Sequence, residues 1–188
     1  MKYLLALLII LAVGIAGAAP DPNLLAGNWT GSITKNLKDE KGGGSPTQGT
    51  TGTPVTIHFS KAGTELVGTS TVGSDKENWK IHGDQYTWDD GKITVTAKLV
   101  SFNDIPEWVR KQANLTTTDN IFAYKFSSCT VNATKKPCEI KKDLPDGIDK
   151  SGLWLFKVQG EKMDSSVYYT YSSGGQRILE QSLKLSKK

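Results

Sequence analysis

Hydrophobic and polar residues alternate with a period of two along most of the chain. In PVTIHFS, residues 54–60, the side chains of Val55, Ile57 and Phe59 share one face, and polar residues occupy the other. Alternation of this kind is typical of a β-strand with one buried and one solvated face. Residues 93–99 repeat the pattern, so half-buried strands dominate the predicted structure.

Turn signals separate these stretches, as at Gly63, Gly83 and Gly91. After an opening strand around Trp29, further strands are predicted over residues 55–60, 65–72, 77–82, 84–88, 93–99, 120–127, 153–160, 166–172 and 177–185. Strands joined by short turns must hide their edges, and closure into an up-and-down barrel does this most completely. We therefore predict an all-β antiparallel barrel of about 8–10 strands.

One segment departs from the alternation. Residues 104–113 place Ile105, Trp108 and Val109 at helical spacing, with Asp104 and Glu107 positioned as an N-cap and its N3 partner. We predict one short helix that lies over the barrel and covers one of its mouths.

The N-terminal residues have the pattern of an export signal. A lysine near the start, an apolar run to about Ile15 and the small residues Ala16-Gly17-Ala18 predict a signal peptide over residues 1–18. The run is shorter than a membrane anchor requires. We expect a secreted protein, extracellular or periplasmic, with no membrane insertion and a single monomeric domain over residues 19–188.

The cysteine content supports the same compartment. Cys129 and Cys138 are the two cysteines of the chain, so an exported protein has one intramolecular pairing available to it. We predict that disulfide. His58 and His82 occur singly, so no metal site is predicted and no cofactor is expected.

Charge and glycosylation signals add little. The net charge of +4 at pH 7 is small and scattered, which argues against nucleic acid as a partner. Asn28, Asn114 and Asn132 each begin an Asn-x-Thr triplet and are candidate glycosylation sites in a eukaryotic source.

The sequence around Trp29 is similar to a motif of a known family of barrels. Trp29 shares a strand face with Gly31 and Ile33, so it is predicted to point inward. The motif Gly27-Asn28-Trp29 resembles the start of the lipocalin-like (calycin) barrels, which open on a glycine-x-tryptophan. In those barrels a basic residue of the last strand crosses the tryptophan, and the resemblance implies that Arg177 has this structural role here.

The inward positions suggest a function. Small closed barrels are either filled by side chains or hold one small ligand. Large aromatic residues assigned inward would line an apolar cavity with tyrosine hydroxyls as polar handles. We expect a binding protein for a small hydrophobic molecule. The predicted ligand-binding residues are Trp79, Tyr86, Trp88, Phe122, Tyr124, Phe126 and Trp154.

Catalysis has little support. Neither a G-x-S-x-G motif nor a cysteine–histidine pair occurs, and Asp89-Asp90 precede Gly91 as turn residues. We therefore expect no enzyme activity. The alternative function is an interaction module with a filled barrel. In that case, a long loop over residues 37–53 and the loop over 129–138 would contact an extracellular protein or glycan.

Overall fold

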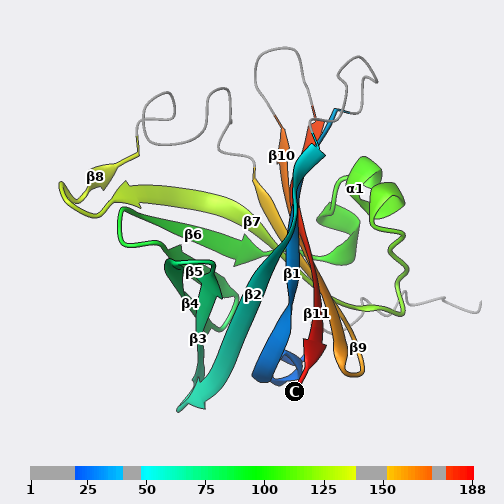
Figure 1. Cartoon of the computed structure of the whole chain (residues 1–188), viewed down its shortest axis with the longest axis horizontal. Helices are drawn as coiled ribbons and strands as arrows, with labels where there is room; N and C mark the ends of the chain where they lie inside the picture. The colour runs from blue at the N-terminus through cyan, green and yellow to red at the C-terminus, as the bar shows by residue number, and fades with distance from the viewer. Residues whose placement is uncertain (1–19, 40–47, 139–151, 171–176) are drawn as a thin grey trace, which may run out of the picture.

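The computed structural model describes residues 20–39, 48–138, 152–170 and 177–188, and Figure 1 shows their arrangement. The predicted signal peptide lies outside the described residues. Within the described ranges, no helix combines the length and the hydropathy needed to cross a bilayer.

The strands form one antiparallel sheet that closes into a barrel of ten strands, as predicted. Strand β1 pairs with both β2 and β11, β6 pairs with β7, and the short β8 pairs with β7 outside the closed ring. Consecutive pairing along the chain gives the up-and-down topology. The strands are β1 (Gly27–Asp39), β2 (Gln48–Ala62), β3 (Glu65–Val72), β4 (Asp75–His82), β5 (Gln85–Asp89), β6 (Ile93–Leu99), β7 (Asn120–Val131), β8 (Lys136–Pro137), β9 (Leu153–Gln159), β10 (Lys162–Thr170) and β11 (Arg177–Lys187).

Burial follows the predicted alternation. On β4, Trp79 and Ile81 are buried, whereas Asn78, Lys80 and His82 are exposed. The barrel therefore has a core built from one face of every strand. We call the end with the β3–β4 and β5–β6 turns the upper end, and the end with the β2–β3, β4–β5 and β9–β10 turns the lower end.

The lower end is closed around Trp29. The 3₁₀ helix η1 (Pro22–Leu25) lies beside the C-terminus there (Figure 1), and the indole Nε1–H of Trp29 donates to the carbonyl oxygen of Leu25 at 2.7 Å. Trp29 is fully buried, so its predicted inward direction is confirmed. The prediction that Arg177 is the basic partner of Trp29 is wrong. Lys187 pairs with Trp29 across β1 and β11, and its Nζ lies 5.3 Å from the ring centroid.

Arg177 lies at the opposite end of β11. Its backbone pairs with Thr170 at the start of the strand, ten positions before Lys187. An extended strand rises about 3.3 Å per residue, so its backbone is far from Trp29. A lysine thus takes the place that the family resemblance assigned to Arg177.

The helical segment covers a wall of the barrel and not a mouth. After a 3₁₀ turn η2 (Phe102–Asp104), helix α1 (Glu107–Gln112) packs its Val109 with Leu155 and Tyr168, which face outward from β9 and β10. The expected cap is also corrected. Pro106 occupies the N-cap position, and the Asp104 carboxylate accepts a hydrogen bond from the Ser101 hydroxyl at 2.6 Å.

The predicted loop over residues 37–53 is shorter than expected. Strand β1 continues to Asp39 and β2 begins at Gln48, so much of the segment is β-structure. Threonine favours strands, and the Thr-rich part of the segment falls in β2. Residues 40–47 lie outside the described ranges.

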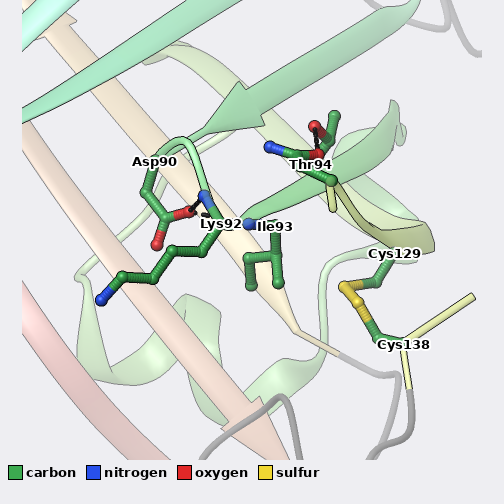
Figure 2. The surroundings of a disulfide bond; sticks show 7 residues. Asp90, Lys92, Ile93, Thr94, Cys129 and Cys138 are labelled. Atoms are coloured by element: carbon green, nitrogen blue, oxygen red, sulfur yellow. Dashed lines mark hydrogen bonds between the residues drawn. A yellow bond between two sulfur atoms is a disulfide. The ribbon is translucent and has the colours of Figure 1, made fainter. Parts of the chain in front are cut away.

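The predicted disulfide is present. Figure 2 shows Cys129 of β7 bonded to Cys138 beside the start of β6. The backbone N–H of Cys138 also donates to the carbonyl of Cys129 at 2.9 Å. The residues between them are not a loop, because β7 runs on to Val131 and β8 forms a hairpin with it. The bond therefore closes a hairpin at the upper end.

Candidate functional site

The predicted aromatic residues gather in the interior of the barrel, on the side formed by β4, β5, β7 and β9. Trp79 is 5.5 Å and Trp154 is 4.9 Å from Tyr86 between ring centroids, and Tyr86 stacks on Tyr124 at 5.1 Å. These rings belong to the main core with Phe122, which pairs with Phe156 across β7 and β9. All seven predicted ligand-binding residues therefore belong to one core cluster.

Two of these rings are less buried than the others. Trp88 and Phe126 are half-buried, and both lie against Trp154, with centroid distances of 6.2 and 4.2 Å. Trp88 precedes the β5–β6 turn, so this pair forms the part of the aromatic cluster closest to the upper end. We call Trp88, Phe126 and Trp154 the upper rings.

The tyrosine hydroxyls behind the upper rings have no partner. Tyr86 and Tyr124 are fully buried, and neither hydroxyl makes a hydrogen bond. A buried polar group without a partner costs about 1–3 kcal/mol. Almost all such groups in proteins are satisfied, so each exception requires an explanation.

Both hydroxyls stay protonated over a wide pH range. Burial raises the pKa of Tyr86 well above its ordinary value, and the nearby negative charge of Glu77 raises it further. Burial likewise raises the pKa of Tyr124. At neutral pH each hydroxyl is therefore a neutral donor and acceptor.

A polar chain faces the same interior. The indole Nε1–H of Trp79 donates to Ser70 Oγ at 2.9 Å, and the Ser70 hydroxyl donates to Glu77 Oε2 at 2.9 Å. Ser70 pairs directly with Glu77 across β3 and β4. Ser70 is buried and Glu77 is half-buried, so this series of hydrogen bonds runs from the core toward the upper end.

The sequence analysis did not identify Ser70 or Glu77. The signal was present, because Glu77 lies two residues before Trp79 and Ser70 lies two before Val72, on inward-facing positions. We had assigned function to aromatic residues alone. A charged residue on the inward face of a barrel strand is the signal that was missed.

The aromatic cluster itself is closely packed. Ring centroids within it are separated by 4.2 to 6.3 Å, which is contact distance for aromatic pairs. Two pockets that the described residues form lie on the outside. One of about 210 Å³ is between the segment after α1 and the outer face of β9 and β10. The other, of about 370 Å³, is at the lower end beside η1.

The outer pocket beside α1 has a charged element. Lys157 Nζ lies 3.0 Å from Asp119 Oδ2 and donates to the carbonyl of Asn114 at 3.1 Å. Despite the cost of burial, hydrogen bonds from Thr116 and Lys157 hold the pKa of the Asp119 carboxyl below its usual value. These contacts fasten the β6–β7 connection to β9, so they have a structural role.

The histidines lie on the outer face, as the alternation predicted. Both are exposed. His58 Nδ1 shares a hydrogen bond with the side chain of Asn28, and His82 Nδ1 lies 3.3 Å from Glu65 Oε1. The described residues hold no group of three or more histidine, cysteine, aspartate or glutamate residues arranged to bind a metal ion.

The three glycosylation triplets have different surroundings. The side chains of Asn28 and Asn114 are exposed. The Asn132 amide donates to Asp89 Oδ1 at 3.0 Å, and its oxygen accepts from the Thr94 hydroxyl at 2.7 Å. A glycan on the Asn132 nitrogen would compete with its hydrogen bond to Asp89, so the geometry favours the other two sites.

Comparison with known structures supports the fold. The crystal structure of Rv2717c from M. tuberculosis aligns with a TM-score of 0.50 and 11% sequence identity, over 88% of this chain and 93% of that chain. A putative thioesterase II from Thermobifida fusca aligns with a TM-score of 0.25 and 10% identity, over 87% of this chain and 78% of that chain. At these identities the first match supports the barrel fold alone, and the second carries no argument. No protein-family model matches the sequence, and a search of curated proteins found no match either.

Proposed function

We propose that the barrel binds one small, largely apolar molecule at its upper end, in contact with the upper rings. The observation that carries this proposal is the pair of fully buried hydroxyls of Tyr86 and Tyr124 that lack partners. Phenylalanine at either position would fill the same space without leaving a hydroxyl unsatisfied. A ligand with one polar group would satisfy them and gain specificity from doing so.

Entry requires a small rearrangement. Trp88 and Phe126 are the half-buried members of the upper rings, so a ligand meets them first. Rotation of these side chains brings the ligand's polar group toward the tyrosine hydroxyls. Side-chain rotation at a binding site is common even where the backbone moves little.

The compartment and the family of the protein are also part of what we propose. We propose that it is secreted after removal of residues 1–18, because the signal-like leader occurs together with a disulfide. We also propose a relation to lipocalin-like barrels, on the basis of Gly27, Trp29 and the closed up-and-down topology. No catalytic role is part of the proposal.

The close packing of the rings favours a second candidate. If the interior stays filled, the barrel acts as a rigid scaffold, and its exposed loops and hairpins contact an extracellular protein or glycan. The disulfide-closed hairpin between Cys129 and Cys138 is an element of that kind. The two candidates differ in whether a small molecule enters the barrel.

A titration separates them. N-phenyl-1-naphthylamine, a neutral apolar fluorophore, is added to the wild type, Tyr86→Phe, Tyr124→Phe and Trp88→Leu. We expect saturable binding with one site, weakened about 5- to 10-fold by each tyrosine change, as loss of about 1–1.4 kcal/mol of hydrogen bonding implies. Loss of affinity with unchanged or increased stability would show that the hydroxyls serve a ligand and not the fold.

Tyr168→Phe is the matched control. Tyr168 is also buried, but it faces outward and packs against Trp108 of α1. Binding that is weakened only by this change would move the site to the outer pocket. A well-folded wild type with no saturable binding would leave the interaction module as the function.

A further inference from the structure

Among the described side chains of the upper interior, the charged ones are acidic, and their sign indicates a class of ligand. The inference rests on the proposed function, because it concerns the same site. On β4, Glu77 shares the inward face with Trp79, and Asp75 falls on that face at the rim. Both are acidic. Glu77 is half-buried and Asp75 is exposed, so the negative charge extends from the rim toward the rings.

No basic residue balances this charge among the described side chains. At the upper end, the inward-facing positions of β3, β5, β6 and β7 are occupied by uncharged residues. None of the salt bridges formed by the described residues includes Glu77. Lys187 contacts an interior ring, but that ring is Trp29 at the lower end, away from Glu77.

Two uncharged described partners hold Glu77 in place. Its Oε2 accepts the Ser70 hydroxyl, and Ser70 accepts the indole N–H of Trp79. Both bonds orient the carboxylate, but neither partner carries a positive charge. A half-buried carboxylate of this kind attracts a cation more strongly than an exposed one, because solvent screens it less.

The rings around it supply the second part of a cation site. Ser70 links the Glu77 carboxylate to the indole of Trp79, whose ring centroid lies 5.5 Å from that of Tyr86. Tyr86 lies against Trp154, which in turn contacts Trp88. The faces of tryptophan and tyrosine attract cations, and clusters of such rings recognise quaternary ammonium groups. The unpartnered hydroxyls of Tyr86 and Tyr124 add two acceptors.

From this combination we infer that the ligand is an amphiphilic organic cation, an amine or quaternary ammonium with an apolar body. The ammonium lies between the Glu77 carboxylate and the aromatic faces, and the apolar body lies along Trp88 and Phe126. A carboxylate ligand of the same size would place like charges together in a poorly solvated site. The site therefore discriminates against fatty acids.

Three ligands with the same chain test the inference. Dodecyltrimethylammonium, dodecanol and dodecanoate, each below its micellar concentration, are titrated by displacement of N-phenyl-1-naphthylamine. We expect the cation to bind the wild type at least 10-fold more tightly than dodecanoate, with dodecanol between them. In Glu77→Gln, which keeps the acceptor for Ser70, the preference for the cation should fall to about 2-fold or less with dodecanol binding unchanged.

Glu161→Gln is the matched control. Glu161 is exposed in the β9–β10 turn at the lower end, so its removal should leave the 10-fold preference intact. Equal binding of all three ligands, tighter binding of dodecanoate, or a preference that survives Glu77→Gln would overturn the cation inference while leaving the binding function standing. The wild-type order alone decides the matter if Glu77→Gln does not fold. Failure of every ligand, including the fluorophore, would overturn the binding function itself.

Discussion

At the scale of single residues, Trp29 and the tyrosine pair show two different uses of a buried aromatic ring. The polar atom of Trp29 is satisfied by the carbonyl of Leu25, and Lys187 covers its face. Trp29 therefore closes the lower end of the barrel. The hydroxyls of Tyr86 and Tyr124 are left without partners, so these residues give up some stability within the aromatic cluster that the proposed ligand contacts.

Replacement of Trp29 should be costly. We predict that Trp29→Ala lowers the free energy of unfolding by about 3–5 kcal/mol, because it removes a large, fully buried side chain and leaves a cavity. Urea denaturation followed by far-ultraviolet circular dichroism measures the change. Leu24→Ala, at a side chain that is 37% exposed, should cost less than about 1 kcal/mol. A loss below about 1 kcal/mol for Trp29→Ala would contradict the closure of the lower end.

The tyrosine pair should make the fold sensitive to alkali. In the unfolded chain these hydroxyls ionise near pH 10, and in the barrel burial raises the pKa of both. Their contribution to stability is complete below about pH 10 and is lost as the pH rises above it. We predict that a variant with Tyr86→Phe and Tyr124→Phe unfolds at a higher pH than the wild type. Near-ultraviolet circular dichroism between about pH 9 and 12 measures the midpoint, and identical midpoints would be inconsistent with the buried hydroxyls.

Among the elements of the fold, strands follow from the local pattern of the sequence more closely than the helix does. Strand β3 occupies the predicted residues 65–72, because alternation records which face is buried. Helix α1 was placed correctly in the chain but over the wrong part of the barrel, because helical spacing does not say which surface the apolar face meets. Its cap was wrong because Pro106, which fixes φ and has no N–H, ends the preceding turn and begins the helix.

The disulfide stabilises one such element. In the chain-entropy model, closing a loop of about ten residues contributes roughly 2.5 kcal/mol. We predict that the double change Cys129→Ser and Cys138→Ser lowers the free energy of unfolding by about 2 kcal/mol or less and leaves the barrel folded. Thermal unfolding of the oxidised wild type and the variant measures this. Complete unfolding of the variant would mean that the hairpin is essential to the ring of strands.

At the scale of the whole molecule, the sequence predicted the ring of strands but not how its ends differ. The alternation placed Trp79, Tyr86 and Tyr124 inward, and the structure confirms these directions. Arg177 was expected beside Trp29 because the family resemblance implies a basic residue of the last strand at that place. Register decides which residues meet, and it depends on pairing between β1 and β11, which are far apart in the chain. The Ser70–Glu77 pair spans a single hairpin, and its signal was an acidic residue on an inward face of β4.

Binding of a small molecule at the upper end should change the indole N–H signals of the tryptophans. The chain has five tryptophans, which report from different places. Trp79, Trp88 and Trp154 lie in the aromatic cluster, Trp29 closes the lower end, and Trp108 lies on α1 outside the barrel. Two-dimensional nitrogen–proton spectra are recorded while N-phenyl-1-naphthylamine is added. We expect saturable shifts for Trp88 and Trp154, smaller ones for Trp79, and none for Trp29 and Trp108. Shifts confined to Trp108, or no shift at any saturating concentration of the fluorophore, would contradict it.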